Sequence, residues 1–168
     1  LGAHPDPRIR ANNQVPTILT VDGALARDKP EIVARYVANR LRVVRQVRYS
    51  LANPLQELDM VLFLNGIAVA TVELKTDFTQ SVRDAVDQYR FDRRPVEKGK
   101  KPEPLLAFPG SALVHFAVSD NEVMMAARLD GPETRFLPFN KGDHGAAGNP
   151  LNPNGHRTAY LWEEIWTR

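Results

Sequence analysis

Two carboxylates and a lysine, at a fixed spacing, are the side chains of this sequence best suited to chemistry. Asp59 lies in one apolar run, and Glu73 and Lys75 close a second apolar run fourteen and sixteen residues later. Alternate side chains of an extended strand share a face, so Glu73 and Lys75 point the same way. Carboxylates can hold Mg²⁺, which prefers oxygen ligands, and the carbonyl of Leu74 can add another. A lysine beside them can orient water or stabilise a phosphate, so the pattern suggests metal-assisted phosphodiester hydrolysis.

The same residues also allow a purely structural interpretation. Lys75 can extend its ammonium group from the end of a strand, and Glu73 can pair with it at a sheet edge. Short motifs of this kind arise by chance. The spacing alone therefore leaves open whether the strand end is a site.

Composition sets the broad class of the protein. The chain has 168 residues, 43% of them hydrophobic and 25% charged, which suits one domain with a core. It has no cysteine, so disulfides and thiolate metal sites are excluded, as fits a reducing cytoplasm. No apolar run approaches the roughly 18 residues of a membrane span. We expect a cytoplasmic piece of a longer protein, with an extension over residues 1–30 and one domain over residues 31–168.

Basic residues are concentrated in one part of the chain, although the formal net charge is only +2. Six of them fall within twelve positions: Arg90, Arg93, Arg94, Lys98, Lys100 and Lys101. Such side chains can contact the phosphates of DNA without reading its sequence. The alternative is a solvated basic loop, with a second basic zone over residues 31–50.

Apolar periodicity predicts an α/β fold with a mixed sheet flanked by helices. The expected elements are a helix over residues 30–42, strands over 43–50, 57–64, 67–75, 111–119, 122–129 and 134–139, an irregular loop over 140–157 and a closing helix over 159–166. The strand over 111–119 is apolar on both faces, so we expect it to be central. His115 lies in that strand, and we predict a hydrogen-bonded core histidine.

A helix is expected between the strands over residues 67–75 and 111–119. Asp77 and Gln80 have the spacing of a capping box, with Asp77 as the N-cap. An apolar stripe follows at helical spacing: Val82, Ala85, Val86 and Tyr89. We expect this helix to end near Asp92.

The turn between the two site strands decides whether their carboxylates meet. Asn65-Gly66 between apolar runs is a strong hairpin signal. A plain two-residue turn places Asp59 opposite Val72, on the wrong face, and a shift of one residue reverses the faces. A three-residue loop over 64–66 places Asp59 opposite Thr71, on the face of Glu73, and places Glu57 opposite Glu73. Because a shared metal requires one face, we predict this loop or an equivalent bulge.

Asp59 followed by Glu73-x-Lys75, on a helix–strand–strand–strand–helix–strand frame, resembles the PD-(D/E)xK nuclease superfamily, with Leu58 in place of the proline. A closer resemblance is to the N-terminal nuclease domain of the R (restriction and motor) subunit of type I restriction–modification enzymes. It covers most of the chain from about residue 31, through five matching stretches: 39–50, 58–75, 84–95, 113–142 and 148–166.

The resemblance implies a restriction-endonuclease-like core and DNA cleavage dependent on Mg²⁺, with Mn²⁺ as a substitute. The metal-binding acidic residues of the family fall on Asp59 and Glu73, and its catalytic lysine falls on Lys75. A glutamine of a Gln-x-x-x-Tyr motif falls on Gln88. Here Asp92 stands where that motif has tyrosine.

The resemblance also implies a larger assembly. The R subunit carries an ATP-driven translocase, and this sequence has no G-x-x-x-x-G-K-[ST] loop, so ATP concerns the full subunit alone. Specificity and methyltransferase subunits are the implied partners, with double-stranded DNA as substrate. We expect the endonuclease domain of a type I site-specific deoxyribonuclease with little sequence preference of its own. The alternatives are a non-catalytic module that docks DNA or subunits, and a repair or junction-resolving nuclease.

Overall fold

The computed structural model describes residues 29–50 and 53–167. The chain forms two compact units, Leu1–Arg40 and Leu41–Arg168. In the first unit the structure describes helix α3, Pro30–Val37, with the proline in its first turn. The expected extension over residues 1–30 lies almost entirely outside the described residues.

The helix expected to reach Arg42 is shorter than predicted. It ends at Val37, and strand β1 already begins at Leu41. Pairing of β1 along the whole of β2 outweighs the weak helical preference of this segment. The prediction of a helix over residues 38–42 was therefore wrong.

The second unit contains one six-stranded mixed sheet with the spatial order β1-β2-β3-β4-β5-β6. Its strands are β1 (Leu41–Arg48), β2 (Glu57–Leu64), β3 (Ile67–Leu74), β4 (Val114–Val118), β5 (Val123–Ala126) and β6 (Leu137–Pro138). Strands β3 and β4 are parallel, and every other neighbouring pair is antiparallel. The α/β restriction-endonuclease-like core expected from the sequence is confirmed.

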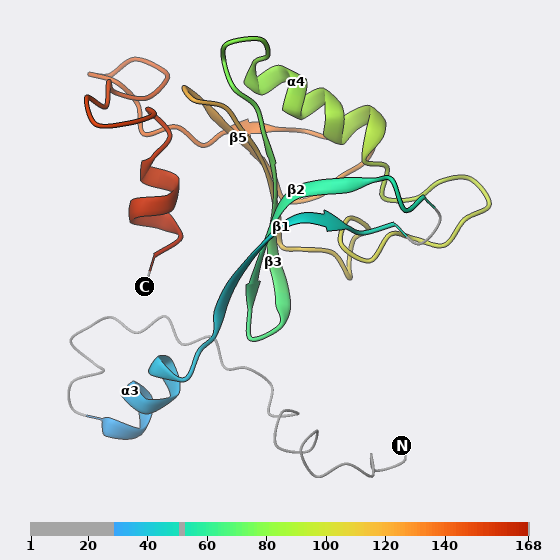
Figure 1. Ribbon diagram of the computed structural model, residues 1–168, viewed down its shortest axis with the longest axis horizontal. Coiled ribbons are helices and arrows are strands. Elements are labelled where there is room, and N and C mark those ends of the chain that lie inside the picture. Colours follow the sequence, from blue (N-terminus) through green and yellow to red (C-terminus); the bar gives the residue numbers. More distant parts are fainter. Residues whose placement is uncertain (1–28, 51–52, 168) are drawn as a thin grey trace. The chain divides into compact units, whose positions relative to one another are not determined.

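Helices cover the two faces of this sheet, as Figure 1 shows for α4 and for the C-terminal helical turn. Helix α4 (Val82–Asp87) continues as a π-helical turn, η1 (Gln88–Asp92), so the predicted end at Asp92 is confirmed. The predicted apolar stripe is buried against the sheet. On the opposite face, η2 (Leu161–Ile165) buries Leu161 in a second apolar cluster. The segment between β6 and η2 is irregular, as expected.

The N-cap of α4 differs from the prediction. Ser81 caps the helix, and Asp84 completes the capping box. Asp77 is instead engaged by Asn121, whose backbone N–H and side-chain amide donate to its carboxylate at 3.0 and 2.8 Å. The predicted capping box at Asp77 and Gln80 was wrong, because the Asp77 carboxylate binds Asn121 in the β4–β5 turn instead.

The β2–β3 hairpin has the predicted strands and a different turn. Leu64 pairs with Ile67, which leaves a two-residue turn at Asn65 and Gly66. Their φ angles are 53° and 86°, the left-handed pair that a type I′ turn needs. The three-residue loop over 64–66 was therefore wrong.

A β-bulge in β3 supplies the register shift instead. Phe63 pairs with Ala68, and Leu62 pairs with Ala70, so Val69 is an additional residue on β3. The prediction of an equivalent bulge is confirmed.

The bulge decides which residues face each other near the strand ends. Met60 pairs with Val72, and this register continued by one residue places Asp59 opposite Glu73. Asp59 is therefore not opposite Thr71, and the prediction of Glu57 opposite Glu73 was wrong by two residues. The carboxylates nevertheless share a face, because the shift is an odd number of residues from the plain hairpin.

Strand β1 is irregular directly across from the same position. Gln46 has a φ of 52°, and the paired residues of β1 and β2 skip Gln46 and Asp59. A left-handed conformation costs a non-glycine residue about 1–2 kcal/mol.

We predict that Gln46→Gly changes the free energy of unfolding by less than about 0.5 kcal/mol, because relief of the left-handed strain offsets the entropy cost of glycine. The matched control is Val44→Gly, on the same face of the same strand, which should lower stability by about 1 kcal/mol. Urea unfolding of both variants tests this. Equal destabilisation of the two would show that Gln46 carries no strain.

Candidate active site

Asp59 and Glu73 are held side by side at the ends of β2 and β3. The N–H of Leu74 donates to Asp59 Oδ2 at 2.7 Å, which fixes the aspartate against the neighbouring strand. Glu73 is fully buried, with 0% of its surface exposed. The bulged register and this hydrogen bond together place both carboxylates on the face that α4 covers.

Arg93, which directly follows η1, forms an ion pair with the buried glutamate. Its Nε donates to Glu73 Oε1 at 2.7 Å, and the arginine side chain is only 11% exposed. Burial raises the pKa of Glu73 to about 8; the Arg93 guanidinium opposes this rise, and the neighbouring Asp59 carboxylate adds to it. Glu73 Oε2 is buried and has no hydrogen-bond partner among the described residues. One oxygen of the Glu73 carboxylate thus binds the Arg93 guanidinium, and the other oxygen has no partner among the described residues.

Lys75 and Gln88 both line a separate polar cleft of about 420 Å³ between the end of β3 and the α4–η1 helix. The cleft is also lined by Gln80, Asp84, Asp87, Phe91 and Asp92. Gln88 Oε1 is buried without a hydrogen-bond partner in the part of the chain that the structure describes. Lys75 connects this cleft to the carboxylates, because it lies two residues after Glu73 on the same strand face.

The donor set around Glu73 fits a divalent cation that needs few protein ligands. Within residues 29–50 and 53–167, no three His, Asp or Glu side chains gather closely enough to hold a metal. Mg²⁺ is commonly bound by one or two carboxylates, with water and substrate phosphate completing its shell. Asp59 and the unpartnered Oε2 of Glu73 meet that requirement, and the carbonyl of Leu74 remains the expected third protein ligand.

Two of the six predicted DNA-contacting residues are partly buried and bind distant parts of the fold. Arg93 binds Glu73, as described above. Arg90 donates to the carbonyl of Thr134 through Nε and Nη2, at 3.2 and 3.0 Å. Both arginines therefore tie η1 to other parts of the fold, a role that the charge pattern did not indicate.

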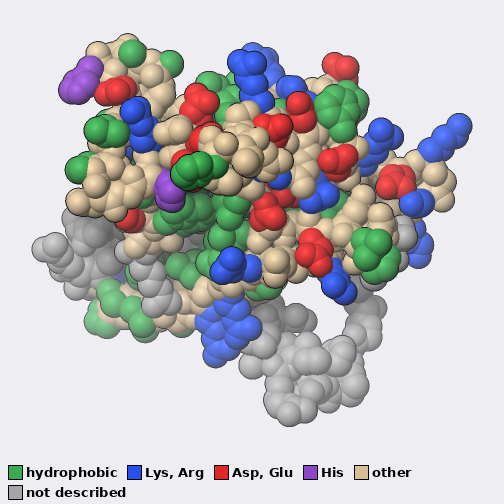
Figure 2. Space-filling view, turned by 45° about the horizontal axis from the view of Figure 1, so that its top comes forward, with side chains coloured by type: hydrophobic (Ala, Val, Ile, Leu, Met, Phe, Trp, Pro, Cys, Tyr) green, Lys and Arg blue, Asp and Glu red, His purple; other side chains and the backbone are tan. Residues whose placement is uncertain are grey.

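The other four basic residues lie on the surface of the segment after η1. Arg94, Lys98, Lys100 and Lys101 are exposed. Lys100 pairs with Glu97, and Arg94 donates to the carbonyl of Phe91. In Figure 2 blue Lys and Arg side chains project from the right-hand side of the molecule, with acidic side chains nearer the middle of the face.

A buried polar cluster lies on the same sheet face as Glu73. Thr71 Oγ1 is 2.8 Å from the Tyr89 hydroxyl and 2.7 Å from His115 Nδ1, and all three residues have 0% exposure. His115 is thus a hydrogen-bonded core histidine, as predicted. Thr71 was missed as the shared partner; its sequence signal was a polar residue on the Glu73 face of an apolar strand.

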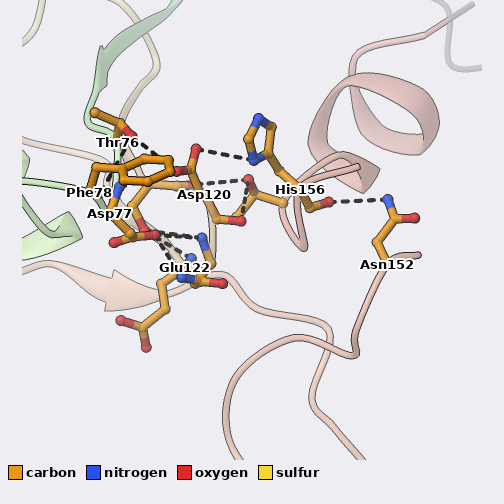
Figure 3. Close-up of polar contacts among 10 residues, drawn as sticks. Thr76, Asp77, Phe78, Asp120, Glu122, Asn152 and His156 are labelled. Carbon is orange, nitrogen blue, oxygen red and sulfur yellow. Dashed lines mark hydrogen bonds and ion pairs between the residues drawn. The ribbon is translucent and has the colours of Figure 1, made fainter. Parts of the chain in front are cut away.

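Hydrogen bonds fix the segment that follows the lysine, as Figure 3 shows. Asp120, after β4, accepts from the Thr76 hydroxyl at 3.2 Å and from the N–H of Asp77 at 3.1 Å. His156 Nδ1 lies 3.2 Å from the other oxygen of Asp120. The ends of the parallel strands β3 and β4 are thereby joined to each other and to the irregular C-terminal segment.

Comparison with known proteins adds one match. A family model described as the type I restriction enzyme R protein N terminus matches residues 9–134, which is most of the chain and includes both carboxylates, Lys75 and Gln88. No curated protein matches the chain, and no solved structure matches it.

Loss of the Arg93 guanidinium should destabilise the fold in a pH-dependent way. At about pH 9, Arg93→Met leaves a charged, buried Glu73 without its partner, at a cost of about 3 kcal/mol. At about pH 6 the cost should be smaller, because the glutamate can then stay protonated. Urea unfolding at both pH values measures the difference.

The control for that prediction is the same substitution in a Glu73→Gln background. There the effect of Arg93→Met should lose its pH dependence. A cost that is independent of pH in both backgrounds would show that Arg93 stabilises the fold through packing alone.

The buried histidine predicts a second pH effect. Burial lowers the pKa of His115 from 6.5 to about 4, so between these values the unfolded chain binds more protons than the folded one. Stability should therefore fall as the pH drops from about 6.5 to about 4, by up to about 3 kcal/mol. His115→Asn, which does not titrate, should show less of this loss in urea unfolding. The exposed His144→Asn should behave like the parent; equal losses in all three proteins would contradict the assignment.

Proposed function

Because this chain belongs to the family of type I restriction enzyme R protein N-terminal domains, we propose that it hydrolyses DNA phosphodiester bonds with the help of Mg²⁺. The observation that carries the proposal is the pairing of two carboxylates at one point. Asp59 faces Glu73 across β2 and β3, and Glu73 keeps one buried oxygen without a hydrogen bond among the described residues.

Asp59, Glu73 and the carbonyl of Leu74 are the proposed metal ligands. A divalent cation supplies charge stabilisation at the phosphate and lowers the pKa of a bound water, and Mn²⁺ can take the place of Mg²⁺. The N–H of Leu74 holds the Asp59 carboxylate in position for this role. Burial favours a cation at Oε2 of Glu73, because Arg93 binds only the other oxygen of this buried carboxylate.

Lys75 and Gln88 are the proposed residues on the substrate side. Lys75 is partly buried at the strand end, where its ammonium group can orient an attacking water or stabilise charge on the phosphate. Gln88 shares its cleft and presents a carbonyl oxygen that lacks a partner among the described residues. That oxygen can accept a hydrogen bond from water near the scissile group.

Contacts to the DNA backbone are proposed for the six basic residues. Arg94, Lys98, Lys100 and Lys101 are exposed and can reach phosphates directly. Arg90 and Arg93 would contact phosphates from positions nearer the protein core, since both already bind protein groups. Phosphate contacts carry no sequence information, so the domain should cut double-stranded DNA with little preference of its own.

The family implies a complex with DNA and other subunits. We propose that the partners are the specificity and methyltransferase subunits of a restriction system in the cytoplasm, and that ATP serves a motor outside this chain. No helix among the described residues is long and apolar enough to cross a membrane.

One observation favours the rival function, a non-catalytic docking module with the same fold. Arg93 already neutralises Glu73, and a buried carboxylate paired in this way can be purely structural. The two functions differ in whether Asp59 and Glu73 bind metal together.

Calorimetric titration with MnCl₂ separates them. The parent should bind Mn²⁺, and Asp59→Asn and Glu73→Gln should each weaken binding by about tenfold or more. Glu57→Gln is the matched control, because Glu57 is a carboxylate of the same strand that pairs with Arg48 and should leave binding unchanged. Lys75→Ala should bind metal normally and lose DNA cleavage. Equal affinity in the parent and both carboxylate variants would support the docking module.

A further inference from the structure

A second cleft, of about 390 Å³, lies next to the candidate site. Three segments line it: residues 94–96 after η1, residues 107–108, and residues 128–132 after β5. Its volume falls in the range of about 300–1,000 Å³ that is typical of small-molecule sites. None of the proposed catalytic residues lines this cleft, so the nuclease site does not account for it.

An aromatic ring and a cation are stacked at the wall of the cleft. Phe108 is 62% exposed, and the guanidinium carbon of Arg128 lies 5.6 Å from its ring centroid. An exposed phenylalanine adds little to the core, whereas an open aromatic face beside an arginine is a platform for a nucleobase.

The charge of the cleft suits an anionic ligand. Arg94 and Arg128 line it, against Asp130 as the one acidic residue among its lining positions. The same chain segment continues into the exposed Lys98 and Lys101. The rest of the lining is largely apolar, with Pro95, Val96, Leu129 and Pro132. Two arginines among largely apolar lining residues match a base with its attached phosphate better than a bare phosphate.

The cleft is attached firmly to the candidate site. Arg94 directly follows Arg93, which binds Glu73. On the other side, Arg90 holds the loop after β5 through its two hydrogen bonds to the carbonyl of Thr134. A strand bound in the cleft would therefore lie beside η1, the element that carries Gln88.

We propose that this cleft binds an unpaired nucleotide of a DNA strand, with the base against Phe108 and the phosphate near Arg94 and Arg128. The inference rests on the proposed function only in taking DNA as the ligand. Bases in a duplex are stacked and closed to such a contact, so the cleft selects a strand that is locally unpaired.

The test measures single-strand binding without any divalent metal. A fluorescein-labelled oligothymidylate of about twelve nucleotides, in EDTA, is titrated with the protein and followed by anisotropy. Phe108→Ala should weaken binding about tenfold, and Phe108→Trp should retain it, because tryptophan preserves the stacking face. Arg128→Gln should also weaken binding. A duplex of the same length should be bound almost equally by the parent and by Phe108→Ala.

Two matched substitutions outside the cleft serve as controls. Phe78→Ala removes a phenylalanine that is 94% exposed on the β3–α4 loop, and Arg83→Gln removes an exposed arginine of α4. Both should bind the oligonucleotide within about twofold of the parent.

Three results would overturn the proposal. They are no single-strand binding by the parent, parent-like binding by Phe108→Ala, and an equal loss of duplex and single-strand binding in that variant. The second result would assign the cleft to another ligand, such as a protein segment. Because the assay contains no metal, its failure is distinct from failure of the Mn²⁺ titration at Asp59 and Glu73.

Discussion

One extra residue in β3 determines which side chains of the β2–β3 hairpin share a face of the sheet. With a regular two-residue hairpin, Asp59 and Glu73 would lie on opposite faces of the sheet. The bulge at Val69 shifts the register by one and brings them opposite each other, while the type I′ turn at Asn65-Gly66 keeps its preferred geometry. The apolar residues of both strands keep their places in the two cores. A second irregularity lies in β1, where the paired residues of β1 and β2 skip Gln46 and Asp59.

Burial of Glu73 creates the second constraint. A carboxylate with no solvent contact needs a cation, and Arg93 provides one to a single oxygen. Thr71, Tyr89 and His115, on the same face of the sheet, bond to one another, and none of them donates a hydrogen bond to the glutamate. The result is a polar layer between β3 and the α4–η1 helix in which burial shifts the pKa of both Glu73 and His115. The other oxygen of Glu73 is buried without a partner among the described residues, and it is the atom proposed to bind a metal ion.

Sequence periodicity predicted the elements of the fold whose formation depends mainly on residues close together in the chain. The hairpin strands, the central β4 and the apolar stripe of α4 follow from periodicity, and the shared face of Asp59 and Glu73 follows from requiring one metal site. The turn type and the cap at Ser81 were missed, because a bulge and a contact from Asn121 compete with the local signals. Arg93 was interpreted as a phosphate ligand, since no spacing rule reveals an ion pair formed across twenty residues.

The most direct test of the shared metal site is the position of Mn²⁺ in a crystal of this domain, located by its anomalous scattering. A shared metal site predicts one strong peak bonded to the carboxylates of Asp59 and Glu73, at the distances of about 2.0–2.2 Å usual for small divalent cations. A peak elsewhere, or no peak while Arg93 remains the partner of Glu73, would contradict a shared metal site. The paired carboxylates would then be a structural feature of the sheet.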